Sequence, residues 1–343
     1  MSPENLPIDT GAEPAQAVDS FSTRHTKIIL SAVLLILLIG VGTLYSNLKN
    51  ISGVQAPAAP SGNIYLGLAP GNSSNPSIYA YDLARGNLSP VSLITPNANS
   101  VSISSDGNLL SFVGWKEDNI SHVFVLDIFK NTSYQVTSDS PKLPRAPRWS
   151  PDNRQVAFTA STAQTPDFRD LDSWGAYVSS LRGETIFIAP GAYPEWLTEE
   201  RGLFLRSDGV YTFDLKSKKI GLVLPMLNSK AAFNMRLAVS PDKTKLAWSA
   251  PSIGKVYVYA IRSLESSFDT LSLEKTLEIN SHSFWVVFSP NSNYLATQEV
   301  DWDKIYTDDP KPRIVIFNTE GERVRQIDLP GYNQQTMFLS EWK

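Results

Sequence analysis

A repeated unit of 43 to 49 residues constrains the fold of this chain more than any other feature of its sequence. Each copy has an apolar, β-branched or aromatic run, a tight turn related to Ser-Pro-Asp, and a second apolar run. In such a turn, Pro presets φ at the first central position, Asp accepts hydrogen bonds from nearby backbone N–H groups, and a following Gly or Asn tolerates positive φ. Each copy therefore predicts a β-hairpin. Five copies are visible, at 101–112, 147–158, 194–205, 237–248 and 286–297.

A third apolar run recurs alongside these hairpins. The runs mix aromatic with β-branched residues, as buried strands do. They lie at 78–82, 123–127, 210–214, 256–260 and 314–318. A period of this length, with three strand-like runs and room for a fourth, matches one four-stranded blade of a β-propeller. The 23 prolines and 19 glycines also suit a turn-rich, all-β protein.

The two ends of the repeat array predict how the ring closes. Residues 63–68 match the second strand of a blade, and the runs at 78–82 and 88–94 supply its third and fourth strands, so this blade lacks a first strand. Residues 336–343 resemble a first strand with nothing after it. We therefore expect a six-bladed β-propeller over 63–343, closed by pairing of the C-terminal strand with 63–68, which leaves no open edge strand.

The copy at 147–158, with Trp149, Pro151 and Asp152, resembles the Pro-Asp repeat propellers, namely the periplasmic TolB-like family and the propeller domains of prolyl-peptidase-type proteins. The resemblance covers about residues 62–343. It implies the propeller fold and a habit of binding proteins or peptides, and it implies no reaction. TolB carries a separate α/β domain before its propeller, and we expect this chain to be without it.

An uncharged stretch at 28–48 predicts one transmembrane helix before the propeller. Its 21 residues would span roughly 30 Å as a helix, which is the thickness of the hydrocarbon core of a bilayer. A buried soluble helix would show a polar stripe, and none is present. A cleaved signal peptide is the alternative, since 54–56 forms a small-x-small site, but Pro57 follows it directly.

The charges that flank this stretch predict its orientation. Arg24 and Lys27 precede it and Lys49 follows it, so the positive-inside rule places the N-terminus in the cytoplasm. Residues 1–27 then form a disordered cytoplasmic tail, and 49–62 form a short linker rich in Pro and Ala. We expect the propeller to lie outside the cytoplasm, in the periplasm or at the cell surface, with membrane lipid contacting 28–48.

Composition and motifs exclude several classes of function. The net charge of −4, from 30 basic and 34 acidic residues, predicts no nucleic-acid partner. The sequence has no cysteine and three histidines, and it contains no nucleophile elbow, zinc-protease motif, phosphate-binding loop or dinucleotide fingerprint. We therefore expect no cofactor, no metal site and no enzymatic activity. For His122 and His282 we expect a surface or strand-edge position.

Acidic and aromatic residues gather in the predicted loops between second and third strands. These loops should share one face of the propeller, opposite the Ser-Pro-Asp turns. Tryptophan buries a large rigid surface at low entropy cost and is enriched in binding sites. The alternatives are that the rings pack on the propeller's own rim, and that the acids are merely solvated or bind Ca²⁺. The candidate binding residues are Trp115, Trp174, Trp302, Asp167, Asp170, Asp172, Asp301 and Asp303.

Two hypotheses about function follow from these loops. The first is a non-enzymatic, membrane-anchored propeller that binds a protein, a peptide or an envelope glycan, with the acidic residues selecting a cationic partner. The second is a glycan lyase or hydrolase that uses paired carboxylates. Carboxylates that converge within about 5–10 Å in a pocket would favour the enzyme.

Overall fold

The computed structural model describes the protein from residue 59 onward, with several interruptions. The predicted tail, transmembrane helix and most of the linker lie outside the described residues. Within the described part, no helix is long and apolar enough to cross a membrane. The described residues are 59–70, 76–91, 99–116, 120–161, 167, 170–225, 236–250, 254–262, 273–280, 283–299, 312–332 and 337–343.

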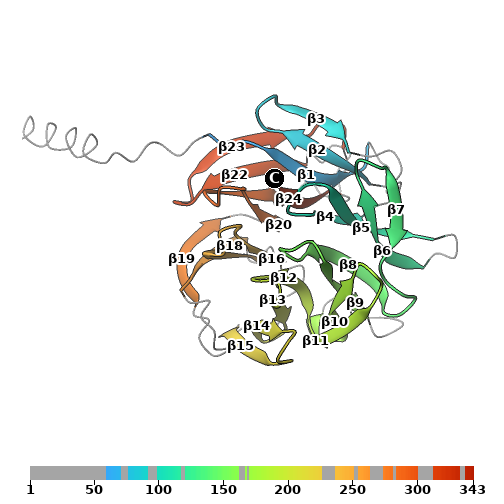
Figure 1. The fold of residues 1–343 in the computed structure, drawn as a ribbon. Coiled ribbons are helices and arrows are strands. Elements are labelled where there is room, and N and C mark those ends of the chain that lie inside the picture. Colours follow the sequence, from blue (N-terminus) through green and yellow to red (C-terminus); the bar gives the residue numbers. More distant parts are fainter. Residues whose placement is uncertain are drawn as a thin grey trace, which may run out of the picture. The chain divides into compact units, whose positions relative to one another are not determined.

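The described residues form six four-stranded antiparallel sheets arranged as the blades of a ring, which confirms the predicted propeller (Figure 1). Blade 1 contains β24 (Phe338–Trp342), β1 (Asn63–Leu68), β2 (Ser77–Asp82) and β3 (Asn87–Pro90). Blade 2 contains β4 (Asn99–Ile103), β5 (Leu109–Trp115), β6 (Ser121–Asp127) and β7 (Thr132–Gln135). Blade 3 contains β8 (Lys142–Trp149), β9 (Gln155–Ser161), β10 (Trp174–Ser180) and β11 (Thr185–Pro190), with a 3-10 helix, η1 (Leu171–Ser173), before β10.

The remaining blades follow in chain order. Blade 4 contains β12 (Ala192–Trp196), β13 (Arg201–Arg206), β14 (Gly209–Asp214) and β15 (Ile220–Pro225). Blade 5 contains β16 (Arg236–Val239), β17 (Lys245–Ala250), β18 (Lys255–Ile261) and β19 (Leu273–Asn280). Blade 6 contains β20 (Ser283–Phe288), β21 (Tyr294–Glu299), β22 (Arg313–Asn318) and β23 (Arg323–Asp328). The first strand of each blade is innermost in the ring, as Figure 1 shows for β4, β8, β12, β16, β20 and β24.

The C-terminal strand closes the ring, as the repeat pattern predicts. Strand β24 pairs antiparallel with β1, with Trp342 opposite Ile64 and Phe338 opposite Gly67. The Asn63 N–H donates to the carbonyl of Lys343 at 2.6 Å, and the Lys343 N–H donates back at 2.9 Å. Strands from the two ends of the sequence therefore lie side by side in one sheet, and blade 1 has four strands like the other five blades.

The hydrophobic core lies between neighbouring blades. One cluster joins Ile64 and Leu66 of blade 1 to Ile314 and Ile316 of blade 6, and each of these side chains is fully buried. Tryptophans at the end of the first strand connect the backbones of adjacent blades. The Trp149 indole donates to the Ser102 carbonyl at 3.1 Å, and that of Trp196 donates to the Arg148 carbonyl at 3.0 Å.

The Pro-Asp turns share one geometry. In each, the Ser hydroxyl donates to the acidic or amide side chain two residues later, at 2.6 Å in Ser240 to Asp242 and 2.7 Å in Ser289 to Asn291. The residue after this side chain takes positive φ, for example 61° at Lys243. We call the face that carries the turns at 104–107, 150–153, 240–243 and 289–292 the Pro-Asp face.

The ionised Asp242 carboxylate stabilises the propeller, and this stabilisation is lost in acid. Burial raises its pKa, but hydrogen bonds from Ser240 and Thr244 outweigh burial and lower the pKa to about 2. A folded-state pKa below the unfolded value of 3.8 stabilises the fold above about pH 4, and this contribution disappears as the pH falls from about 4 to about 2.

We therefore expect Asp242→Asn to lower the free energy of unfolding at pH 7 by about 1 kcal/mol, a figure reduced because the side chain is 42% exposed. The same substitution should flatten the pH dependence between pH 4 and 2. Urea unfolding at several pH values measures both effects. Blade 6 carries Asn291 at the equivalent position with the same hydrogen bonds, so the turn geometry should survive. An unchanged pH dependence would contradict this role of Asp242.

Candidate functional site

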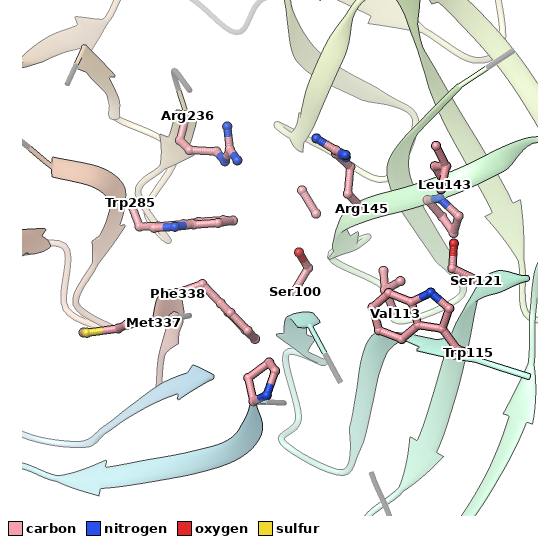
Figure 2. Close-up of a pocket in the computed structure, with 13 residues that line it drawn as sticks. Ser100, Val113, Trp115, Ser121, Leu143, Arg145, Arg236, Trp285, Met337 and Phe338 are labelled. Carbon is pink, nitrogen blue, oxygen red and sulfur yellow. The ribbon is translucent and has the colours of Figure 1, made fainter. Parts of the chain in front are cut away.

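A pocket of about 400 Å³ opens in the ring on the face opposite the Pro-Asp face. We call it the mouth pocket (Figure 2). The first strands of the blades begin at this face, and the β5–β6 connection lies there too, so residues from five blades line the pocket. The lining residues are Pro76, Ser100, Val113, Trp115, Ser121, Leu143, Pro144, Arg145, Ala146, Arg236, Trp285, Met337 and Phe338.

Strand β8 reaches the pocket along an irregular path. Its pairing with β9 shifts register on both sides of Arg145. Leu143 and Ala146 adopt φ of 53° and 50°, a region that L-residues seldom occupy. Bulges of this kind redirect side chains and are common beside functional sites. In β8, the register shifts flank Arg145, which lines the pocket.

Arg145 lies on the ring of Trp174. The guanidinium carbon is 3.9 Å from the ring centre, within the range of a cation–π interaction. The indole N–H of Trp174 donates to the carbonyl of Asp167 at 3.2 Å. The Trp174 side chain is only 4% exposed, which agrees with the alternative that this ring packs against the propeller itself. Trp174 packs in a buried cluster with Ala146 and Leu171, and its ring lies against Arg145.

Arg236 approaches the pocket from the other side. Its guanidinium carbon is 3.6 Å from the ring centre of Tyr193 and 4.4 Å from that of Trp285. Burial, together with the positive charges of Arg145 and Arg148, lowers the pKa of Arg236 to about 10. The side chain is therefore still a cation at neutral pH. Figure 2 shows Arg145 and Arg236 extending toward each other across the pocket.

Trp115 forms part of the opposite wall of the mouth pocket. It ends β5, is paired with Ser121 at the start of β6, and is 44% exposed. This placement agrees with the expectation of an accessible ring on the loop face. Among the candidate residues that the structure describes, Trp115 is the one that lines the pocket.

The acidic residues of the blade 3 loop contact the protein itself. Asp170 caps η1 and accepts a hydrogen bond from the Asp172 N–H at 3.0 Å. Asp172 pairs with Arg206 at 3.3 Å and accepts a hydrogen bond from the Ser207 hydroxyl. The loop is thereby attached to the β13–β14 turn of blade 4. Asp167, Asp170 and Asp172 are not among the described residues that line the mouth pocket.

The blade 6 candidates cannot be placed in this arrangement. Asp301, Trp302, Asp303 and His282 lie outside the described residues. The described residues contain no group of three His, Cys, Asp or Glu side chains able to hold a metal ion. His122, on β6, is buried, and its Nδ1 lies 3.1 Å from the side-chain nitrogen of Gln135.

Residues missed by the sequence reasoning follow a simple rule. The repeat alignment places Ile103, Trp149, Trp196, Val239, Phe288 and Trp342 just before the turn or at the end of the first strand. In every blade except blade 4, which contains Trp196, the residue three or four positions earlier lines the mouth pocket. Those residues are Ser100, Arg145, Arg236, Trp285 and Phe338. The repeat alignment could therefore have identified these pocket residues, because they occupy one position of the first strand that lies before the turn motif.

A second pocket, of about 300 Å³, lies inside the Pro-Asp face. Its lining includes Arg148 and Glu195, whose Nε and Oε1 atoms are 2.6 Å apart, and also Glu341. Burial opposes the charge on Arg148, but Glu195 and Glu341 more than compensate and raise its pKa. These side chains come from the inner strands of blades 3, 4 and 1. The Arg148–Glu195 ion pair therefore connects the neighbouring blades 3 and 4.

Comparison with known proteins identifies the fold. No protein-family model matches the sequence, and no curated protein matches it. Among solved structures, TolB from Acinetobacter baumannii aligns with a TM-score of 0.59 at 16% identity, over 86% of this chain and 70% of that one. A putative TolB from Agrobacterium tumefaciens gives 0.54 at 13% identity, over 83% and 94%. A chain of the nidogen/laminin complex gives 0.53 at 8% identity, over 81% and 97%. At these identities the likeness concerns the fold alone, and the chain is a six-bladed β-propeller similar in structure to TolB propellers.

Proposed function

We propose that this protein is a non-enzymatic binding protein that holds a protein, peptide or envelope-glycan partner in the mouth pocket. The observation that carries the proposal is the lining of that pocket. An exposed indole, two arginines and further aromatic and aliphatic side chains converge in a concave site of about 400 Å³. Tryptophan and arginine are the residue types most enriched among the dominant contacts of protein interfaces.

The described lining favours binding over acid–base catalysis. Glycan hydrolysis uses two carboxyl groups that flank the scissile bond, and general acid–base catalysis most often uses His, Asp or Glu. None of the described residues that line the mouth pocket is of these types. Asp170 and Asp172 are engaged in η1 and the blade 4 contact. The enzyme hypothesis would therefore depend on Asp301 and Asp303.

We also propose that residues 28–48 form the membrane anchor that the sequence predicts. A helix over 28–48 would hold the propeller close to the bilayer, because the linker at 49–62 is short. With the N-terminus in the cytoplasm, the mouth pocket would meet partners of the periplasm or the cell surface. The resemblance to periplasmic TolB-like propellers is consistent with this placement.

Replacement of one exposed aromatic residue on each face should show which face of the propeller binds the partner. We expect Trp115→Ala to lower the amount of partner captured from the native cell envelope by about 30-fold, as for a tryptophan at the centre of an interface. The matched control is Phe129→Ala. Phe129 is 81% exposed in the β6–β7 turn of the same blade, at the Pro-Asp face.

Quantitative mass spectrometry of partners captured by the full-length chain and by each variant provides the measurement. Specific partners should be lost with Trp115→Ala and retained with Phe129→Ala. Equal recovery by the wild type and Trp115→Ala, or equal losses with both variants, would contradict a binding site at the mouth pocket.

A further inference from the structure

Two arginines that converge across the mouth pocket indicate the chemistry of its ligand. Arg145 comes from β8 and Arg236 from β16, so blades 3 and 5 each contribute one. Both side chains are half-buried, and each lies against aromatic rings. Figure 2 shows the two guanidinium groups pointing toward one another above Ser100. The fold thus holds two positive charges at a shared concave site.

The aromatic contacts orient both cations. A guanidinium that stacks on a ring has its flat face covered, while its N–H groups lie in the plane and point outward from the edge. That edge matches the two oxygens of a carboxylate, which accept parallel hydrogen bonds from one guanidinium. Stacking also reduces the freedom that each side chain loses when a ligand binds. The geometry therefore suits recognition of a planar anion.

The like charges favour an anion for an electrostatic reason as well. Arg145 lowers the pKa of Arg236 because two cations in a partly buried site repel each other. An anion between them would offset this repulsion. A cationic ligand would increase it. The preference for a cationic partner, expected from the Asp loops, is thus the opposite of what the described pocket offers.

The other side chains that line the pocket fit a peptide better than a glycan. Among the described lining side chains, the oxygen acceptors are the hydroxyls of Ser100 and Ser121, whereas a sugar ring presents several hydroxyl donors that need acceptors. The other walls are apolar, with Trp115, Phe338 and Val113 among them. Such walls fit an aliphatic or aromatic side chain next to an acidic group.

We propose that the mouth pocket binds a peptide segment through a carboxylate held between Arg145 and Arg236, with the neighbouring apolar side chain against Trp115 and Phe338. This inference rests on the proposed binding function and names the ligand class for the same site. The carboxylate can belong to an acidic side chain or to a peptide C-terminus, because both present the same two oxygens.

Three capped dipeptides and one sugar acid test the proposal on the full-length chain in detergent. The first peptide is N-acetyl-Glu-Phe-amide, the second is its neutral counterpart N-acetyl-Gln-Phe-amide, and the third is N-acetyl-Gln-Phe with a free C-terminus. D-galacturonate represents an acidic glycan. Ligand-observed NMR gives the dissociation constants. We expect at least one charged peptide to bind about tenfold or more tightly than the neutral peptide, and more tightly than the sugar acid.

Substitution of the arginines should remove this preference for charge. Arg145→Gln and Arg236→Gln should each bring the charged peptide to within about threefold of the neutral one, whereas Arg145→Lys should keep part of the difference because it keeps the charge. Arg182→Gln, an exposed arginine in the β10–β11 turn, is the matched control. Thermal unfolding verifies each variant, and Arg145→Gln alone is sufficient if Arg236→Gln does not fold.

The possible outcomes separate this proposal from the binding function. Equal affinities for the charged and neutral peptides, no detectable binding of any peptide, or tighter binding of galacturonate would each overturn carboxylate–peptide recognition. In those cases loss of the native partner with Trp115→Ala would still support the mouth pocket as a binding site. If Trp115→Ala has no effect on native partners, the proposed function itself fails.

Discussion

Removal of residues 336–343 is expected to unfold most of the propeller at 25 °C. This truncation deletes β24, whose Phe338, Leu339 and Trp342 side chains are almost completely buried. Truncation of a buried Leu, Phe or Trp costs about 2–5 kcal/mol each, and typical domains are stable by only about 5–15 kcal/mol. The deletion also exposes the edge of β1. Far-UV circular dichroism and limited proteolysis, before and after truncation, measure the effect.

Two controls distinguish ring closure from a general effect of truncation. Val324→Ala, at an exposed position on β23, should leave the melting temperature almost unchanged. A synthetic peptide of residues 336–343, added at high concentration, should restore part of the protease resistance by pairing with β1. A truncated chain that melts at the temperature of the intact one would show that the C-terminal strand does not complete the propeller.

Loss of either partner of the buried Arg148–Glu195 pair is expected to destabilise the propeller more than loss of any charged residue in an exposed ion pair. The two side chains are only 10% and 14% exposed, and their Nε and Oε1 atoms are 2.6 Å apart. Removal of one partner leaves the other charge buried and uncompensated, which costs about 3–5 kcal/mol. Glu195→Leu and Arg148→Met should each show this loss in urea unfolding at pH 7.

The double variant provides the decisive comparison. Arg148→Met combined with Glu195→Leu removes both charges, and we expect it to be markedly more stable than either single variant. Arg85→Ala breaks the exposed pair with Asp82 and should lower the free energy of unfolding far less than either buried variant. Strictly additive losses in the double variant would mean that Arg148 and Glu195 do not stabilise the ring as a pair.

The fold could be predicted because its determinants are local and repeated. The Ser-Pro-Asp turns specify hairpins through contacts between residues two to five positions apart, such as Ser240 with Asp242 and Lys245. Five repetitions reveal the blade, and the unmatched strands at the two ends reveal the closure. The pairing of 63–68 with the C-terminal strand then follows from counting strands.

The binding pocket was harder to predict because its side chains are oriented by irregular backbone and by neighbouring blades. Register shifts in β8 surround Arg145, and Arg236 of blade 5 lies against Tyr193 of blade 4 and Trp285 of blade 6. Likewise, composition cannot reveal that Asp172 pairs with Arg206, 34 residues later. Of the candidate aromatic residues, Trp115 reaches the pocket, Trp174 lies against Arg145, and Trp302 lies outside the described residues.

Site-directed photo-crosslinking in intact cells would test the binding role of the mouth pocket most directly. Benzoylphenylalanine is introduced in place of Trp115 at the mouth pocket or of Phe129 at the Pro-Asp face, and the adducts formed on irradiation are quantified. A pocket that binds a partner predicts a discrete adduct from position 115 that is absent from position 129 and is reduced by Arg145→Gln. An adduct from position 129 alone, or the same adducts from both positions, would contradict it.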